Sequence, residues 1–565
     1  MAIRRGRMRL GDLLVQQKVL TEEDLMEALQ KQRGTGRKIG EVLVEEGYIT
    51  EELIARALQT QLGLKIVQLT GVVIPPEVRD LVTPDILKKY VCIPFELDPY
   101  NANILHLAMA DPMDMAAIDD ISIVTNLQVE PFISTQREIL AALDRAYGAA
   151  ETLSAAQRFT RERAQLRGNL DTEPEVDPDV DDAPIVQLVR SLIEQAVRQR
   201  TSDIHIEALE SKVRVRYRID GALFEKMVYD NNLLPAISTR IKIMGGMDIS
   251  EKRKPQDGRM TVVVDRQEYD IRISSVPTVH GEKIVMRLSS KLALTRNKRD
   301  LGLGPEDLER FDQMLSNPFG IIFVTGPTGS GKSTTLYTAL SELNKEAVNI
   351  VTVEDPVEAD IEGINQIQVN NKVNLTFASA LRSILRQDPD IIMIGEIRDQ
   401  ETASIAVQAS ITGHLVVSTL HTNNAVGTLN RMADMGVERY LIADSVVGVI
   451  AQRLVRKLCP HCRKQRMATV EEKRLMKLDS DQEYQIYEPG GCDLCNHTGY
   501  FGRIGVYEIL EVNEEIRKLI AENASTEELE AAAKANGMKT LRQNGIRYVL
   551  EGTTSIEEML KASYE

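Results

Sequence analysis

The stretch GIIFVTGPTGSGKSTT (Gly320 to Thr335) indicates how the C-terminal half of the chain folds. It combines an apolar strand, a glycine-rich loop and a helix start, with the pattern GxxxxGKS complete. In such a loop, backbone N–H groups enclose phosphates, Lys332 reaches the β and γ phosphates, and the Ser333 hydroxyl serves Mg²⁺. A chance match in a glycine-rich turn is the alternative, which the flanking strand and helix disfavour. The predicted ATP-binding residues are Gly326, Pro327, Thr328, Gly329, Ser330, Gly331, Lys332, Ser333 and Thr334.

Carboxylates follow two further apolar strands. NIVTV ends in EDPVE, which holds Glu354, Asp355 and Glu358, and IIMI is followed by Gly395 and Glu396. Parallel strands end at one edge of a sheet, so these acids should lie beside the phosphate loop, where one can hold Mg²⁺ and another orient water. The alternatives are a solvated acidic turn and an ordinary surface acid. We predict Glu354, Glu358 and Glu396 as catalytic and Asp355 as nucleotide-binding.

Two histidines flank the next apolar strand, in TGHLVVSTLHTN. A single histidine is more often a core or surface residue than a functional group. Together, however, His414 and His421 stand beside Ser418, Thr419 and Thr422, which are polar groups able to sense a γ-phosphate. We therefore predict both histidines as catalytic.

Four of the five cysteines form two CxxC pairs, CPHC and CDLC. Each pair lets two thiolates approach one ion from a tight turn, and two pairs make a tetrahedral set typical of structural Zn²⁺. A redox role is the alternative. His461 and His497 could replace a ligand, but four cysteines already close the coordination shell. The predicted metal ligands are Cys459, Cys462, Cys492 and Cys495, in a module spanning about 456–503.

Length and composition limit the remaining possibilities. A chain of 565 residues with 43% hydrophobic residues should form several folded domains. Its formal net charge of −16 disfavours nucleic acid as a partner. Neither a membrane span nor a signal peptide is evident, so we expect a cytoplasmic protein.

The N-terminal region, 1–148, begins with an internal repeat. RLGDLLVQQKVLTEEDLMEALQKQ and KIGEVLVEEGYITEELIARALQTQ align without a gap over 9–61, and each predicts a helical hairpin. Residues 64–148 predict a small α/β unit. A docking module for a partner protein and a degenerate helix-turn-helix are two interpretations of the repeat, and the acidic charge disfavours the second.

Residues 149–183 are predicted to be a flexible linker, because their end, DTEPEVDPDVDD, is acidic and contains prolines. An α+β domain follows over 184–290, then a basic connector over 291–300 and an ATPase domain over 301–565, which ends in helices over 511–565. In VRVRYRID, Arg214, Arg216 and Arg218 share one face of a strand. A solvated basic face is the alternative to anion binding, although no comparable run of acids lies nearby in the sequence.

Four of these motifs, GPTGSGKSTT, VEDPVE, LRSILRQDPDIIMIGEIRD and TGHLVVSTLHTN, closely resemble the secretion ATPase superfamily that powers type II secretion and type IV pili. The resemblance covers Ala183 to the C-terminus. It implies a RecA-like P-loop core, a preceding PAS-like α+β domain and a ring-shaped homohexamer. It also implies that Glu396 is the catalytic glutamate and that arginines, here predicted as Arg216 and Arg218, reach the neighbouring subunit's ATP.

The repeat, with RLG and KIG at its two starts, resembles the domain through which many such ATPases bind cyclic di-GMP. Basic residues and glycine turns suit the phosphodiester, and aliphatic residues suit the guanine faces. The first repeat departs from the family pattern, with Lys18 where the second has Gly47. The residues implied are Arg9, Leu10, Gly11, Leu14, Lys38, Ile39, Gly40 and Leu43.

Within the family, the combination of domains is most similar to the assembly ATPases of type IV pili, with type II secretion ATPases as the alternative. We expect a motor that uses ATP, Mg²⁺ and structural Zn²⁺, with cyclic di-GMP as effector. Its expected partner is an inner-membrane platform protein, at the cytoplasmic face of that membrane. Retraction ATPases fit less well, because they lack the zinc module. From another class, a nucleotide-responsive sensor or scaffold would show little turnover.

Overall fold

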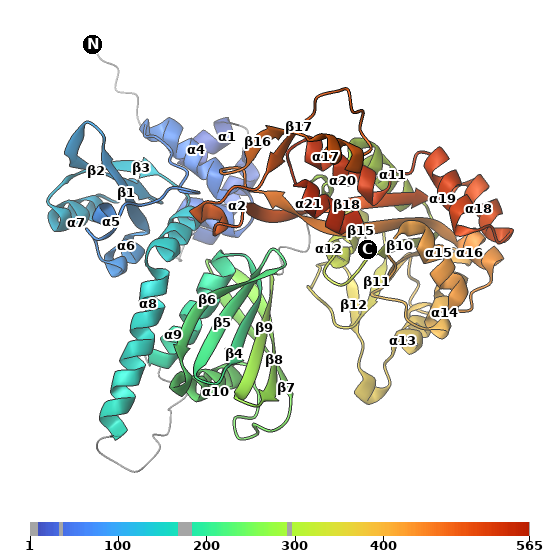
Figure 1. Cartoon of the computed structure of the whole chain (residues 1–565), viewed down its shortest axis with the longest axis horizontal. Helices are drawn as coiled ribbons and strands as arrows, with labels where there is room; N and C mark the ends of the chain where they lie inside the picture. Colours follow the sequence, from blue (N-terminus) through green and yellow to red (C-terminus); the bar gives the residue numbers. More distant parts are fainter. Residues whose placement is uncertain (1–9, 18, 33–37, 168–183, 291–296, 564–565) are drawn as a thin grey trace. The chain divides into compact units, whose positions relative to one another are not determined.

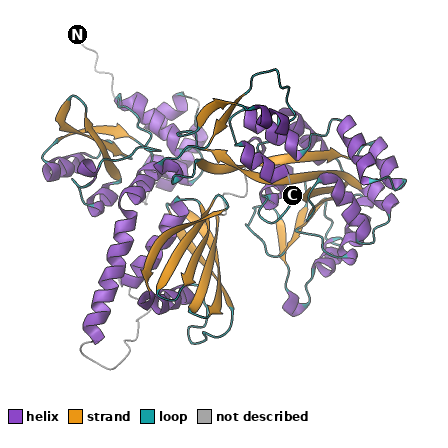
Figure 2. Cartoon of the chain, in the orientation of Figure 1, coloured by secondary structure: helices purple, strands orange, loops and turns teal. Residues whose placement is uncertain are grey.

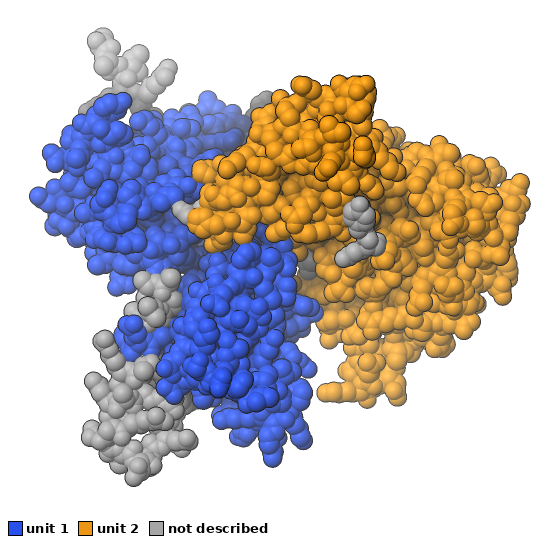
Figure 3. All heavy atoms as spheres, viewed as in Figure 1, with its two compact units in different colours: residues 1–288 blue, residues 289–565 orange. Residues whose placement is uncertain are grey.

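The computed structural model describes residues 10–17, 19–32, 38–167, 184–290 and 297–563. They belong to two compact units, Met1–Leu288 and Ser289–Glu565 (Figure 3). Both units combine helices with sheets, as Figure 2 shows. None of the helices in these ranges is long and apolar enough to span a membrane.

The sequence repeat folds into four helices. They are α1 (Leu10–Gln16), α2 (Glu22–Gln32), α3 (Ile39–Glu45) and α4 (Glu51–Leu62). Helix α2 packs on α3 and α1 packs on α4, around a core that contains Leu14 and Leu43. The predicted pair of helical hairpins is therefore confirmed. Gly47 has φ of +75°, a conformation that favours glycine; Lys18, at the equivalent position, lies outside the described residues.

A small α/β unit follows the repeat, as predicted. Its sheet has the order β1-β2-β3, with β1 antiparallel and β3 parallel to β2. Its elements are α5 (Pro76–Arg79), α6 (Pro84–Tyr90), β1 (Cys92–Asp98), β2 (Asn101–Met109), α7 (Met115–Thr125) and β3 (Gln128–Ile133).

The prediction of a flexible linker over 149–183 is wrong for its first part. Helix α8 (Gln136–Arg167) continues through 149–167 (Figure 1). The physical reason is composition: AETLSAAQRFTRERAQLR has no Pro or Gly and is rich in good helix formers. The acidic stretch 168–183 lies outside the described residues.

The middle domain is a six-stranded sheet with the order β6-β5-β4-β9-β8-β7. Helices α9 and α10 share one hydrophobic core with the sheet, and α9 packs on β4. The elements are α9 (Pro184–Arg198), β4 (Thr201–Ala208), β5 (Lys212–Ile219), β6 (Ala222–Asp230), α10 (Leu234–Met244), β7 (Gln256–Val264), β8 (Gln267–Thr278) and β9 (Gly281–Ser290).

The second unit is built on a seven-stranded sheet with the order β12-β11-β13-β14-β10-β15-β18. Its strands are parallel except for β18, which pairs antiparallel with β15. The strands are β10 (Gly320–Thr325), β11 (Ile350–Glu354), β12 (Asn365–Gln368), β13 (Ile391–Ile394), β14 (Leu415–Leu420), β15 (Val446–Leu458) and β18 (Tyr500–Glu511).

Helices and a small hairpin complete this unit. The helices before β15 are α11 (Pro305–Leu315), α12 (Lys332–Leu343), α13 (Phe377–Ile384), α14 (Gln400–Ile411), α15 (Ala425–Asp434) and α16 (Arg439–Ser445). Between β15 and β18 come β16 (Lys464–Met467), α17 (Val470–Leu475) and β17 (Gln485–Glu488). The chain ends with α18 (Glu514–Ala521), α19 (Thr526–Ala535), α20 (Leu541–Leu550) and α21 (Ile556–Ser563).

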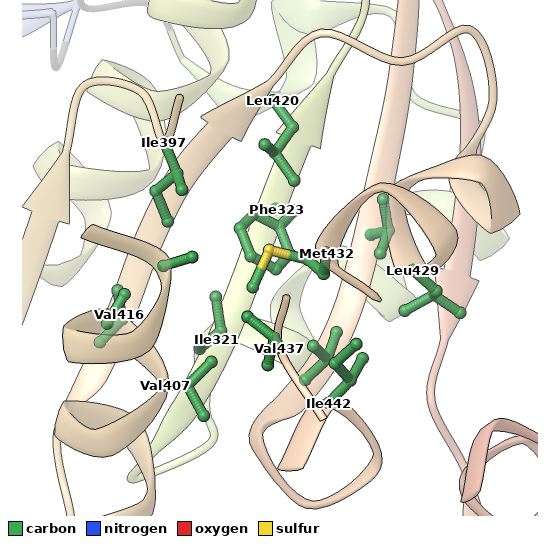
Figure 4. Close-up of a cluster of buried hydrophobic side chains, with 14 of the residues drawn as sticks. Ile321, Phe323, Ile397, Val407, Val416, Leu420, Leu429, Met432, Val437 and Ile442 are labelled. Carbon is green, nitrogen blue, oxygen red and sulfur yellow. The ribbon is translucent and has the colours of Figure 1, made fainter. Parts of the chain in front are cut away.

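Both faces of this sheet are buried. Along β10, Ile321 and Phe323 enter one hydrophobic core, drawn in Figure 4, whereas Ile322 and Val324 enter the core on the opposite face. This alternation explains why β10 is a continuous apolar run in the sequence. A strand fixed on both sides holds the phosphate loop that follows it.

Candidate nucleotide site and metal centre

The phosphate loop joins β10 to α12 at the C-terminal edge of the parallel strands. Gly326, Gly329 and Gly331 have φ of +148°, +80° and +90°. A Cβ on Gly326 would lie 2.4 Å from the Gln452 carbonyl oxygen, so β15 closes the loop from below. The Oγ of Ser330 is buried and has no hydrogen-bond partner among the described residues. An unsatisfied hydroxyl inside a glycine cradle fits a loop that binds phosphate oxygens.

Lys332 points back into this loop. Its Nζ donates hydrogen bonds to the carbonyl oxygens of Gly326 (2.7 Å) and Pro327 (3.2 Å). The pKa of Lys332 is lowered to about 8, mainly by burial; Glu396 opposes this shift and Arg453 adds to it. Ser333 follows it, exposed, in the first turn of α12. The loop therefore presents an ammonium group and a hydroxyl where phosphate oxygens and Mg²⁺ would bind.

Glu396 follows the end of β13, and its charge acts on Lys332, the lysine of the phosphate loop. Its side chain is 13% exposed and bonds Arg398 (Nη2 to Oε1, 2.6 Å). Its other oxygen, Oε2, lies 3.5 Å from Nε2 of His421. Glu396 and His421 are thus together, as the sequence predicted. Arg398, whose side chain is 69% exposed, was not predicted.

The acids of EDPVE occupy different environments. Glu354 is buried, and its oxygens accept hydrogen bonds from the Tyr337 hydroxyl (2.5 Å), Thr352 Oγ1 (2.6 Å) and Gln366 Nε2 (3.0 Å). Asp355, by contrast, is exposed, and Glu358 is half-buried. Glu354 is thus buried and accepts hydrogen bonds from three side chains of the same domain. This geometry indicates a structural role and does not support the prediction that Glu354 is catalytic.

The structure places His414 away from the phosphate loop, contrary to the prediction that it acts beside His421. His414 precedes β14, and its Nδ1 lies 2.9 Å from the Ala409 carbonyl oxygen. Strands β10 and β14 are parallel with Gly320 opposite Leu415, so His414 stands at the N-terminal edge of the sheet. The phosphate loop leaves the other edge, about 20 Å away at roughly 3.3 Å per residue. Within one chain, His414 is therefore too far from that loop to contact a phosphate bound there. Adjacency to an apolar strand does not say at which end of the strand a residue lies.

Two residues of β15 belong to the site and were missed. The Oε1 of Gln452 accepts a hydrogen bond from Thr335 Oγ1 (2.8 Å) beneath the loop. Arg453 is buried, bonds Asn423 through Nη2 (3.2 Å to both oxygens), and acts electrostatically on Lys332. The signal in the sequence was a polar pair, Gln-Arg, that interrupts the apolar run VVGVIAQRLV at 446–455.

The four cysteines of the CxxC pairs converge, as predicted. Their Sγ atoms all lie within 4.8 Å of one another, and the measured pairs are 3.7–3.8 Å apart. Tetrahedral zinc with Zn–S bonds of about 2.3 Å requires sulfur atoms about 3.8 Å apart. The N–H groups of Cys492 and Gly499 also donate to Cys495 Sγ, which suits a thiolate ligand. The donor set therefore fits Zn²⁺ and joins the ends of β15 and β18.

The arginines of β5 share one face, as predicted, but that face is not purely basic. Glu207 on β4 bonds Arg214 (2.9 Å) and Arg216 (2.6 Å). Although burial opposes ionisation, these bonds lower the pKa of Glu207 to about 2. Asp203, four residues before Glu207 on β4, lies 3.6 Å from Arg218 and 3.0 Å from Arg287. The acids were missed because the antiparallel register of β4 and β5, which brings them opposite the arginines, is not visible in the sequence.

Of the residues predicted to bind cyclic di-GMP, some are buried and others are accessible to solvent. Gly11 and Gly40 lie inside α1 and α3 rather than in turns, and a Cβ on them would meet Leu25 and Ile54. Four of the eight residues are buried and serve the repeat's own packing: Gly11, Leu14, Gly40 and Leu43. Lys38 is exposed and pairs with Asp111, and Leu10 and Ile39 are half-buried. Arg9 lies outside the described residues.

Comparisons with known proteins identify the family to which the chain belongs. The model of the family "Type II/IV secretion system protein" matches residues 178–561, and that of the MshEN domain matches 62–153. In solved structures, the fold is similar to that of the Legionella pneumophila ATPase DotB, with a TM-score of 0.51 and 21% identity over 70% of this chain and 98% of that one.

Two curated relatives match almost end to end. The chain is 41% identical to the type IV pilus assembly ATPase PilB of Myxococcus xanthus, over 98% of both chains. It is also 41% identical to the type II secretion system protein E of Xanthomonas campestris pv. campestris, over 99% of both chains. The chain belongs to the type II/IV secretion system family and is an ATPase of the kind that serves pili and type II secretion.

Proposed function

We propose that the chain is the motor of type IV pilus assembly, a homohexamer that hydrolyses ATP to ADP and phosphate. In this proposal it works at the cytoplasmic face of the inner membrane, on a platform protein. The observation that carries the catalytic part is the position of Glu396, which ends a central strand beside Lys332 and His421. The match to a pilus assembly ATPase over 98% of both chains supports the biological role.

The chain's own groups divide the chemistry of phosphoryl transfer. The loop N–H groups and Lys332 bind the phosphates, and Ser333 supplies the hydroxyl ligand for Mg²⁺. Mg²⁺ would neutralise charge that develops on the phosphates, and the exposed Asp355 is the acid that we assign to its outer shell. Glu396 accepts a proton from the attacking water and orients it. His421 and Arg398 each contact one oxygen of the Glu396 carboxylate and so fix its orientation.

We further propose that Arg216 and Arg218 act on ATP bound to a neighbouring subunit. The ion pairs with Glu207 and Asp203 keep both guanidinium groups fixed at the surface of the sheet, where they are 27% and 36% exposed. A side chain that is already held in place loses less conformational entropy when it binds an anion than a mobile one does. Arg216→Ala should therefore lower turnover without lowering the affinity of the isolated subunit for ATP.

We assign a structural Zn²⁺ to the four cysteines, because they already close a tetrahedral shell and leave no position for a reacting group. We also propose that the N-terminal repeat binds cyclic di-GMP through Leu10, Lys38 and Ile39, the accessible members of the predicted set. Calorimetric titration of the full chain tests the effector. A flat titration, or an unchanged affinity in Lys38→Ala, would leave the repeat as a protein-docking module.

Purified protein tests the motor proposal. Phosphate release should be abolished in Lys332→Ala, and stimulated by the cytoplasmic part of a pilus platform protein. If wild type and Lys332→Ala released phosphate equally slowly, the chain would be a sensor or scaffold. Type II secretion is the second candidate, because the relative from that system is equally identical over 99% of both chains. Loss of pili, rather than loss of secreted enzymes, on deletion of the gene distinguishes the two.

A further inference from the structure

A second cluster of metal-binding side chains lies in the N-terminal α/β unit. His106, on β2, is opposite Glu96 on β1 and Glu130 on β3, so one face of the three-stranded sheet carries all three. Asp98, at the end of β1, completes the group. Oxygen atoms of Asp98 and Glu130 and a ring nitrogen of His106 all lie within 4.8 Å of one another. Nothing in the proposed motor mechanism uses these residues.

The orientation of the imidazole points to a cation. Its side chain is 8% exposed, and its ring packs against those of Phe95 and Phe132, with centroids 5.8 and 4.8 Å away. Nδ1 lies 3.1 Å from Glu96 Oε1, as in sites where a carboxylate orients a metal-binding histidine. Nε2 then carries a lone pair, and it faces two more acceptors, Asp98 Oδ2 at 3.4 Å and Glu130 Oε2 at 3.6 Å. A proton or a metal ion between these three acceptors would offset their mutual repulsion.

The charges and spacings favour a metal over a proton. In the part of the chain that the structure describes, the ion pairs of Glu96, Asp98 and Glu130 are all with His106. One imidazolium would therefore leave two of the three negative charges uncompensated, whereas a divalent cation offsets them. Metal bonds of about 2.0–2.1 Å in tetrahedral geometry place ligands about 3.4 Å apart, close to the observed spacings.

One ligand is fixed in advance. The backbone N–H groups of Tyr100 and Asn101 donate to Asp98 Oδ1 at 2.8 and 2.9 Å, which directs Oδ2 toward His106. We propose that His106, Asp98 and Glu130 bind one divalent transition-metal cation, which ties together β1, β2 and β3 (Figure 1). An N,O,O ligand set of this kind takes zinc and its neighbours in preference to Mg²⁺ or Ca²⁺.

The test is a titration of the full chain with Zn²⁺ in the absence of nucleotide, after the cysteine site has been filled. Calorimetry and metal analysis should find a second zinc per chain. Asp98→Asn and Glu130→Gln, which keep side-chain size, should each weaken its binding at least tenfold, and Glu96→Gln should weaken it 10- to 100-fold. Asp119→Asn, an exposed acid on α7, is the matched control and should bind as wild type.

Two results would overturn the proposal. Wild type could reach saturation with one zinc per chain, which would assign His106 to a protonated ion-pair cluster. Alternatively, the second zinc could persist unchanged in Asp98→Asn and Glu130→Gln, which would place it elsewhere. The carboxylates of Asp98 and Glu130 are 22% and 44% exposed, and both variants keep side-chain size. Circular dichroism should therefore show both variants folded, so that neither result is an effect of misfolding.

Discussion

Replacing Tyr337 with Phe should destabilise the ATPase unit through one hydroxyl. Tyr337 is buried on α12, and its hydroxyl donates to Glu354 Oε2 at 2.5 Å while it accepts from the N–H of Glu358 at 3.1 Å. The variant leaves a buried carboxylate oxygen and a backbone donor without these partners. A hydrogen bond to a charged group contributes about 1.5–3 kcal/mol, so we expect a loss of about 2–3 kcal/mol in the free energy of unfolding.

For a domain of this size, about 1 kcal/mol lowers the melting temperature by about 2–4 °C, so the expected decrease is about 4–12 °C. Scanning calorimetry of nucleotide-free protein measures it, with Tyr440→Phe as the matched control, because Tyr440 is 59% exposed. Turnover should fall as well, because the hydroxyl anchors the EDPVE segment. An unchanged melting temperature would refute the reasoning that the Tyr337–Glu354 bond supports the site.

Three other predictions concern the site and the metal centre. Burial lowers the pKa of Lys332 to about 8, so the free protein loses this charge above pH 8. Bound phosphates raise that pKa, so the Kd for ATP of the wild type should increase up to roughly tenfold per pH unit from pH 8 to 9.5. The Kd of Lys332→Arg should not change over this range. A wild-type Kd that is independent of pH would contradict the prediction. Chelation of zinc should lower the melting temperature of the second unit in wild type but not in Cys495→Ser, and an unaffected wild type would remove the zinc assignment. His421→Ala should lower kcat about 10²-fold while His414→Ala should stay within about threefold, and equal losses would contradict their placement at opposite sheet edges.

Local patterns in the sequence predicted the parts of the structure that depend on neighbours along the chain. The repeat gave four helices, GxxxxGKS gave the strand, loop and helix, and the CxxC pairs gave the sulfur cluster. Glu396 and His421 were also brought together, because each follows an apolar strand of one parallel sheet.

What the sequence could not show depends on contacts between distant segments. Arg453 and Lys332 interact because β15 lies beside β10, and no local motif specifies that order. Glu207 meets Arg214 only through the register of β4 and β5. His414 was misplaced for a related reason, since the direction of β14 within the sheet decides which of its ends meets the nucleotide. The predicted linker begins too early, at 149, because the acidic, proline-containing composition applies only to the end of 149–183. The residues up to Arg167 have the composition of a helix and continue α8.

The most direct test of the account is the comparison of ATP binding with ATP hydrolysis in Glu396→Gln. The carboxamide keeps the size of the side chain but cannot accept a proton from water. If Glu396 orients water, the variant should bind Mg²⁺-ATP within about threefold of wild type and hydrolyse it at least about 10²-fold more slowly. Loss of ATP binding would make Glu396 a residue that binds Mg²⁺, and turnover at the wild-type rate would contradict the assignment of the site.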